Sequence, residues 1–281
     1  MIRPCPVRMV FSDMDGTFLT SQKQVAPATW SALDRLAERG IAFVPCTGRA
    51  FGGIPVPLVT HPATRFAVTA NGAAVFEVDA EGNGARIHHE TMTATQALEV
   101  YDLVRGTDDY FDFFVNGRIY VGRRRYELLG RYVPDAPMLA YMRSARAPID
   151  DDEVLGMLSG PDGVEKISIF CSDASSRARM TDYLACHDDL ASLSSYNDNI
   201  EVTSATATKG NALVLLCERE GIDISSSVAF GDAMNDSTML VAAGDGVAMG
   251  NASEEVKGLS NHVTATNDED GVARYLSSIL A

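Results

Sequence analysis

Four clusters of polar residues in this sequence contain the side chains that could do chemistry, and each follows a short apolar run. They are residues 13–17 (Asp-Met-Asp-Gly-Thr), 47–49 (Thr-Gly-Arg), 71–72 (Asn-Gly) and 231–236 (Gly-Asp-Ala-Met-Asn-Asp). A lysine, Lys209, precedes the last cluster. Carboxylates, a hydroxyl, amides and an ammonium group are the parts from which nucleophilic, acid–base and metal-assisted sites are built.

The spacing of the carboxylates lets them take different tasks at one site. Asp13 and Asp15 stand two residues apart directly after an apolar run, and Gly16 lets the chain turn sharply there. With Asp232 they form an oxygen-only donor set that suits Mg²⁺, and a dication also relieves the repulsion between close carboxylates. Lys209 and the backbone N–H groups at residues 47–48 add positive charge for a phosphate. A carboxylate nucleophile beside Mg²⁺ and lysine is the equipment for phosphoryl transfer through an aspartyl-phosphate.

The elements that must position these clusters alternate between strand and helix. Continuous apolar runs predict buried strands at residues 9–11, 41–44, 66–68, 227–230 and 246–249. Apolar stripes with helical spacing predict helices at residues 27–39 and 209–220 and a further helix around Met239. This alternation predicts a Rossmann-like, doubly wound α/β core with a mainly parallel sheet and helices on both faces. Because ligands bind at the carboxyl ends of such strands, the four clusters should converge on one cleft.

The middle of the chain has a different pattern. Aromatic-rich strands at residues 111–121 flank Asn116 and Gly117, a pair that is typical of a tight hairpin turn. A further strand is expected at residues 164–170 and a helix at residues 175–185. We therefore predict an α+β domain at residues 86–190, inserted into a core formed by residues 1–85 and 191–281.

Composition and charge narrow the class of protein and its partners. The chain has 281 residues, of which 46% are hydrophobic and 22% charged, and its net charge is −15. Such a balance is typical of globular domains and disfavours nucleic acid or an anionic membrane as the main partner. The five cysteines are scattered without metal-ligand spacing, no apolar run is long enough to span a membrane, and no signal-peptide pattern opens the sequence. A cytoplasmic protein is expected.

The ordered set of motifs resembles the haloacid dehalogenase-like (HAD) hydrolases. Asp-Met-Asp-Gly-Thr, Thr-Gly-Arg, Lys-Gly and Gly-Asp-Ala-Met-Asn-Asp stand in that family's order. Asn-Gly-Ala at residues 71–73, the large insert, Gly-Val-Ala-Met-Gly-Asn-Ala at 246–252 and Asn-Asp-Glu-Asp-Gly-Val-Ala at 267–273 are similar to the Cof-type phosphatases. The resemblance covers essentially the whole chain. It implies the HAD fold with an α/β cap of type C2B.

The resemblance also implies a role for each site residue. Asp13 would be the nucleophile, Asp15 the general acid and base, Thr47 and the Gly48 N–H phosphoryl ligands, and Lys209 the neutralising cation. Mg²⁺ would be bound by Asp13, the Asp15 main-chain carbonyl and Asp232, with Asp236 either a further ligand or an anchor for the ligands. Residues that contact or line the phosphoryl site would be Arg49, Asn71, Gly72 and Asn235.

The expected activity is Mg²⁺-dependent hydrolysis of a small phosphorylated metabolite such as a sugar phosphate, a nucleotide or a phosphorylated cofactor. A phosphomutase that returns the phosphoryl group to a sugar is an alternative with the same aspartyl-phosphate. A phospho-accepting signalling module is a second alternative, although it needs neither Asp15 nor an inserted domain of about 100 residues. The sequence contains no feature that sets the oligomeric state or selects one substrate.

Overall fold

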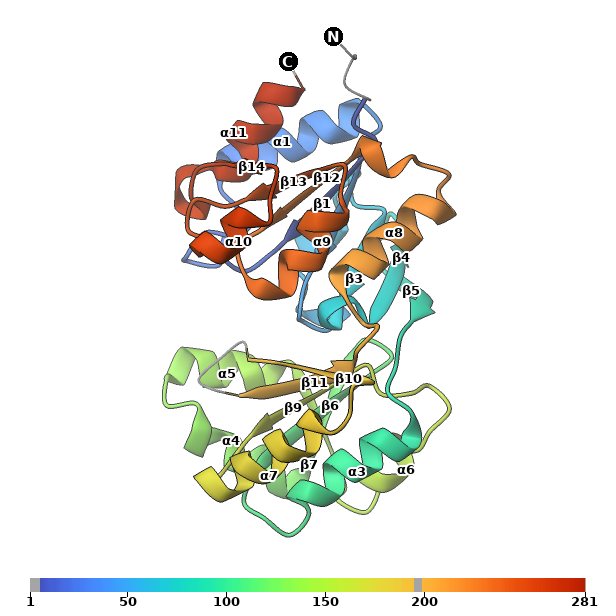
Figure 1. Cartoon of the computed structure of the whole chain (residues 1–281), viewed down its shortest axis with the longest axis vertical. Coiled ribbons are helices and arrows are strands. Elements are labelled where there is room, and N and C mark those ends of the chain that lie inside the picture. Colours follow the sequence, from blue (N-terminus) through green and yellow to red (C-terminus); the bar gives the residue numbers. More distant parts are fainter. Residues whose placement is uncertain (1–5, 195–198, 281) are drawn as a thin grey trace. The chain divides into compact units, whose positions relative to one another are not determined.

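The computed structural model describes residues 6–194 and 199–280, and the chain divides into two compact units (Figure 1). The core unit comprises Met1–Arg49, Ile54–Ile87 and Thr208–Ala281, and the inserted unit comprises Ala50–Gly53 and His88–Ala207. Each unit has its own sheet and its own apolar core, as expected of a domain.

The core unit is built on an eight-stranded sheet in the order β14-β13-β12-β1-β2-β3-β4-β5. Its strands are β1 (Met9–Asp13), β2 (Ala42–Cys46), β3 (Phe66–Thr69), β4 (Ala74–Val78), β5 (Gly84–His89), β12 (Ser227–Gly231), β13 (Asp245–Ala248) and β14 (His262–Val263). Neighbouring strands from β14 to β3 are parallel, and β4 runs antiparallel to β3. The order extends away from β1 in both directions, which is the doubly wound arrangement predicted from the sequence.

Helices cover both faces of this sheet (Figure 1). They are α1 (Pro27–Glu38), α2 (Val56–Val59), α8 (Lys209–Arg219), α9 (Ser237–Ala242), α10 (Glu254–Gly258) and α11 (Gly271–Ile279). The core unit also contains the short 3₁₀ turns η2 (Ala70–Gly72), η3 (Ile224–Ser226), η4 (Met234–Asp236) and η5 (Asn267–Glu269). Ala229 faces the cluster that contains α8, and the next residue, Phe230, meets the ring of Tyr275 on α11 from the opposite face. Side chains alternate along a strand, so both faces are covered, and β1 and β12 are buried along their whole length.

The inserted unit is an α+β domain with a six-stranded sheet in the order β10-β11-β9-β6-β7-β8. The strands are β6 (Tyr110–Val115), β7 (Arg118–Gly122), β8 (Arg146–Ile149), β9 (Lys166–Phe170), β10 (Leu190–Leu193) and β11 (Ile200–Ser204). The helices are α3 (Ala94–Val104), α4 (Arg123–Tyr132), α5 (Ala136–Ser144), α6 (Val154–Leu158) and α7 (Ala174–Ala185), and the unit also contains the 3₁₀ turn η1 (Phe51–Gly53). Asn116 and Gly117 both have positive φ and form the predicted turn between β6 and β7.

The end of the inserted unit differs from the sequence-based expectation. Residues 191–207 were expected in the core, but β10 and β11 pair with each other and β11 pairs with β9 in the inserted sheet. Ile200 and Val202 point into the apolar cluster of that sheet, while Glu201 between them faces the other way. The boundary therefore lies near residue 207 and not at 190. Both strands are short and pair antiparallel to their neighbours, so neither has the continuous apolar run that is typical of a buried parallel strand.

Two expectations about the chain as a whole concern its cysteines and membranes. Cys5 lies outside the described residues, and the four cysteines within them, Cys46, Cys171, Cys186 and Cys217, are free thiols. Within the described part of the chain, none of the helices is long and apolar enough to cross a membrane.

Candidate active site

The loop after β1 places two carboxylates at the carboxyl edge of the core sheet. Asp13 is the last residue of β1 and is 6% exposed, and Asp15 follows in the loop. Gly16 turns this loop with a φ of 93°, and a Cβ at Gly16 would lie 2.5 Å from Oδ2 of Asp232. The Thr17 hydroxyl donates to Oδ1 of Asp232 at 2.6 Å, which joins the loop to the end of β12. Only glycine allows so close an approach.

A buried lysine holds the nucleophile candidate. Lys209 is the first residue of α8 and is 0% exposed, and the Thr208 side chain caps this helix by accepting from the Asn211 N–H. The Lys209 Nζ donates to Oδ1 of Asp13 at 2.5 Å and to Oδ1 of Asp236 at 2.6 Å. Burial lowers the pKa of Lys209, but the two carboxylates outweigh it and hold that pKa above its usual range. Lys209 is therefore a fixed positive charge beside Asp13.

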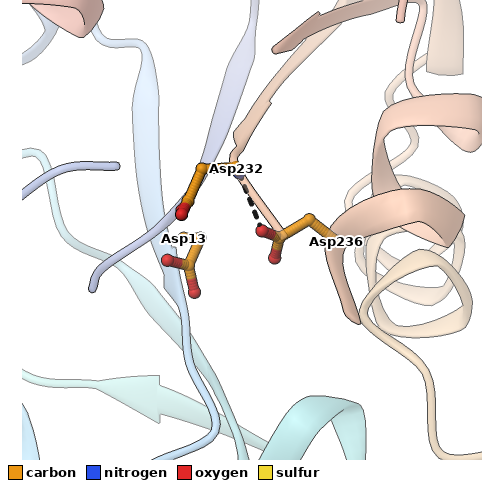
Figure 2. A group of neighbouring side chains, drawn as sticks. All are labelled: Asp13, Asp232 and Asp236. Carbon is orange, nitrogen blue, oxygen red and sulfur yellow. Dashed lines mark hydrogen bonds between the residues drawn. The ribbon is translucent and has the colours of Figure 1, made fainter. Parts of the chain in front are cut away.

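Three carboxylates gather around this lysine. Figure 2 shows Asp13, Asp232 and Asp236 with their carboxylates turned toward one another, and one oxygen of each lies within 4.8 Å of the others. Burial raises the pKa of Asp13 and raises that of Asp232 to about 6, and the charge of Asp236 adds to both effects. The three carboxylates outnumber the one ammonium group that contacts them, so a further positive charge would relieve their repulsion. An oxygen-only donor set of this kind fits a hard divalent cation such as Mg²⁺.

The oxygens of Asp236 are already used by the protein. Its Oδ1 accepts from Lys209, and its Oδ2 accepts from the backbone N–H groups of Asp232 and Ala233 at 3.0 and 3.1 Å. Through these two backbone bonds Asp236, which is 0% exposed, holds the turn that presents Asp232. The structure thus favours the anchoring alternative for Asp236 over direct ligation.

Asp15 is paired with two cations. Arg49, which follows the end of β2, donates from Nε to Oδ2 of Asp15 at 2.8 Å and from NH2 to Oδ1 at 2.7 Å. Lys23 Nζ donates to the same Oδ1 at 2.8 Å. Burial raises the pKa of Asp15, but Arg49 and Lys23 outweigh it and hold that pKa below the usual 3.8. Arg49, expected among the phosphoryl-site residues, is thus also the partner of the acid–base candidate.

The remaining predicted residues complete the same edge of the sheet. Thr47 is 1% exposed at the end of β2, and its hydroxyl accepts from the Arg49 N–H at 3.1 Å. A Cβ at Gly48 would lie 2.9 Å from Oδ1 of Asn71, and that same Oδ1 accepts from Nδ2 of Asn235 at 3.2 Å. The backbone at residue 72 passes close to the start of α8, because a Cβ there would lie 2.3 Å from the Thr208 carbonyl.

The core unit therefore brings together all of the residues predicted for the site: Asp13, Asp15, Thr47, Gly48, Arg49, Asn71, Gly72, Lys209, Asp232, Asn235 and Asp236. The sequence did not predict the contact of Lys23 with Asp15. Lys23 lies in a loop and has a φ of 59°. A lysine among polar loop residues gives no sequence signal for such a contact. The link from Thr17 to Asp232 was not predicted either.

Comparison with known proteins shows which family the chain belongs to. A model of the haloacid dehalogenase-like hydrolase family matches residues 10–276. Phosphatase YwpJ of Bacillus subtilis is 30% identical, with 98% of this chain and 100% of YwpJ covered. The 5-amino-6-(5-phospho-D-ribitylamino)uracil phosphatase YwtE of Bacillus subtilis is 26% identical, with 98% of this chain and 99% of YwtE covered. The solved structure of a haloacid dehalogenase-like hydrolase from B. subtilis has a TM-score of 0.79 at 31% identity and covers 96% of this chain and 99% of that one.

The family match and the relatives place this doubly wound core with its inserted α+β unit among hydrolytic enzymes. The chain belongs to the haloacid dehalogenase-like hydrolase family and is a phosphatase of its Cof type. The resemblance and the fold class predicted from the motifs are thereby confirmed.

Proposed function

We propose that this phosphatase hydrolyses a small-metabolite phosphomonoester through an aspartyl-phosphate on Asp13 and depends on Mg²⁺. The observation that carries the proposal is the buried Lys209 bound to Asp13 at 2.5 Å, within a cluster of three carboxylates. Asp13 and Asp232 would hold Mg²⁺, as would the Asp15 main-chain carbonyl. The bound ion would supply charge neutralisation to the nucleophile and the phosphoryl group.

Asp13 would act as the nucleophile. Lys209 holds Oδ1 of this carboxylate, so its orientation is fixed before substrate arrives. A carboxylate oxygen forms a bond to phosphorus while the bond from phosphorus to the leaving-group oxygen breaks. Lys209 neutralises part of the charge that develops on the phosphoryl oxygens.

Asp15 would move the protons of both steps. In the first step its carboxyl group gives a proton to the leaving-group oxygen, and in the second its carboxylate takes one from the water that attacks phosphorus. Arg49 and Lys23 hold the carboxylate ionised, which is the form required for the second step. A bound phosphate attracts the same two cations and thereby favours the protonated form for the first step.

The ends of β2 and β3 would bind the phosphoryl oxygens. Thr47 offers a hydroxyl, and Gly48 offers a backbone N–H at a place where a side chain would strike Asn71. Asn235 is held by its bond to Asn71, so the two amides keep each other in place. Donors fixed by the fold in this way stabilise a transition state without reorganising.

The substrate proposed is a small phosphorylated metabolite. YwtE is named for a phosphate ester on a sugar-alcohol chain, which supports testing alkyl phosphates beside nucleotides and pyridoxal phosphate. An inserted unit whose main segment, His88–Ala207, has over 100 residues would serve to select the leaving group and exclude water.

The test is phosphate release from p-nitrophenyl phosphate and a panel of metabolite phosphates, with Mg²⁺ and with EDTA. Release should require Mg²⁺, should be abolished in Asp13→Asn and should persist in Asp102→Asn, whose exposed carboxylate pairs only across one turn of α3. Asp15→Asn should slow both proton transfers, so that with a good leaving group the phospho-enzyme forms and accumulates. Near-native activity in Asp13→Asn would refute the mechanism, and transfer that needs a sugar bisphosphate would identify a phosphomutase instead.

A further inference from the structure

Two asparagines near the end of the chain hold the loop that carries Asp15. Nδ2 of Asn251 donates to the Gly16 carbonyl at 2.8 Å, and Nδ2 of Asn267 donates to the Leu19 carbonyl at 2.9 Å. The two asparagines are joined, because the Asn267 N–H donates to Oδ1 of Asn251 at 3.1 Å. Both belong to motifs that the proposed mechanism leaves without a role.

A third contact extends this arrangement along the loop. The Asp268 carboxylate accepts from the Ser21 N–H at 2.8 Å and from the Ser21 hydroxyl at 2.6 Å. Asn251, Asn267 and Asp268, here called the loop clamp, thus hold the stretch from Gly16 to Ser21 at three places. All the partners lie more than 230 positions apart in the chain.

The clamp is itself fixed by the core sheet. Just beyond β13, the Met249 N–H donates to the Gly231 carbonyl at 2.9 Å and the Gly250 N–H to the Ala265 carbonyl at 3.1 Å. The turn that carries Asn267 is closed by a capping box between Thr266 and Glu269. The clamp therefore connects the loop to β13 and to β12, and Asp232 directly follows β12.

The loop between β1 and α1 also has backbone bonds of its own, such as Leu19 N–H to the Met14 carbonyl at 2.8 Å, and the Met14 and Leu19 side chains are buried. The clamp adds contacts from a distant part of the chain at backbone groups on either side of Thr17. Gly16 follows Asp15, and glycine allows more backbone conformations than any other residue type. The Gly16 carbonyl, the first atom the clamp binds, lies between Asp15 and the Thr17 that reaches Asp232.

The clamp does more than satisfy buried groups. Asn251 and Asp268 are exposed, so water could serve the Gly16 carbonyl and Ser21 if the side chains were absent. Such bonds contribute only about 1 kcal/mol each to stability. Their direct effect is on geometry, since they fix the distance between Asp15 and the carboxylates at the ends of β1 and β12.

We propose that Asn251 and Asn267 are positioning residues, which hold Asp15 where it can pass a proton to the leaving-group oxygen. The inference rests on the proposed function, in which Asp15 is the general acid and base. In this role the two asparagines act through the Gly16 and Leu19 carbonyls, to which their side chains donate.

The test compares Asn251→Ala and Asn267→Ala with the matched control Asn261→Ala. Asn261 also uses its side chain in one bond to backbone, from the Gly246 N–H at 2.8 Å, but does not touch the loop. Each enzyme is assayed on p-nitrophenyl phosphate, whose leaving group needs no proton, and on the best alkyl phosphate of the panel, whose leaving group needs one. Melting temperatures are measured in parallel.

The two clamp variants should lose about tenfold or more in kcat/KM on the alkyl phosphate and about threefold or less on p-nitrophenyl phosphate. The melting temperature of the control Asn261→Ala should fall by as much as that of the clamp variants, while its activity on both substrates stays unchanged. In an Asp15→Asn background, Asn251→Ala should leave the ratio of the two activities unaltered, because the residue it positions is gone.

The outcomes separate this inference from the proposed function. If wild type is active and Asp13→Asn is dead, equal losses on both substrates, or no loss, overturn the positioning role alone. If wild type releases no phosphate, or if Asp13→Asn remains active, the aspartyl-phosphate mechanism is refuted, and the positioning role that rests on it is refuted too.

Discussion

Lys209→Met should damage the fold as well as the reaction. The ammonium contacts Asp13 and Asp236 at 2.5 and 2.6 Å, and the Lys209 and Asp236 side chains are both 0% exposed. Methionine keeps the length of the side chain and removes its charge, so two buried carboxylates face each other without compensation. Removal of one partner from a buried ionic group costs about 3–5 kcal/mol.

The assay is thermal unfolding, with and without Mg²⁺. At ~2–4 °C per kcal/mol for a domain of this size, the melting temperature should fall by about 6–20 °C. Mg²⁺ should raise the melting temperature of Lys209→Met more than that of wild type, because a bound dication replaces part of the missing charge. Activity should be lost in the folded fraction as well.

A second substitution separates charge from packing. Asp236→Asn removes one carboxylate but keeps an oxygen that can accept from the Asp232 and Ala233 N–H groups. In the double variant with Lys209→Met, the loss of stability should be smaller than the sum of the single losses by about 1–3 kcal/mol. Additive losses within about 0.5 kcal/mol would refute the claim that Lys209 stabilises the site by compensating these carboxylates.

Three further predictions concern a close backbone contact, an acid-sensitive carboxylate and a buried thiol. Gly16→Ala should abolish phosphate release because its Cβ strikes a carboxylate 2.5 Å away, whereas Gly40→Ala, with φ of 65° and nothing within 4 Å, should lose only about 1–2 kcal/mol of stability and keep activity. Burial raises the pKa of Asp109, but hydrogen bonds from the Ser172 N–H and from the hydroxyls of Ser176 and Thr107 outweigh burial and hold that pKa below 3.8. The stability that these bonds give is present above pH 3.8 and is lost as the pH falls further. The free energy of unfolding of Asp109→Asn should therefore depend less on pH in that range than that of wild type. Cys46 is 0% exposed and burial raises its pKa, so iodoacetamide should label the exposed Cys186 and leave Cys46 unlabelled until denaturant is added, which peptide mass spectrometry would show.

Much of the core could be predicted because its signals are local. The apolar run at Met9–Asp13 is buried on both faces and ends in carboxylates, which is typical of a parallel strand beside a ligand site. The convergence of Asp13 and Asp232 follows from that rule alone. The proposed acid–base role of Asp15 came from the family resemblance. The residues alone suggested Lys209 as a positive charge for a phosphate, but spacing does not show which carboxylate a lysine reaches.

What the sequence did not reveal depends on loops and on long-range contacts. Lys23, whose backbone is left-handed, reaches Asp15 within one loop, and Asn251 reaches Gly16 from 235 residues away in the chain. No periodicity in the sequence signals either contact. The strands β10 and β11 were assigned to the wrong unit because each is short and pairs only with antiparallel neighbours.

The register of β1 has a consequence for the order in which the nascent chain can fold. Met9 pairs with Ala42 on one side and with Ser227 on the other, and the contiguous part of the inserted unit, His88–Ala207, is synthesised between them. At ~5–20 residues per second, about 10–45 s separate the appearance of Met9 from that of its second partner on the ribosome. The inserted unit can thus fold while the core sheet is still half complete. During that interval, the edge of β1 that will receive β12 remains unpaired and open to other strands or to chaperones.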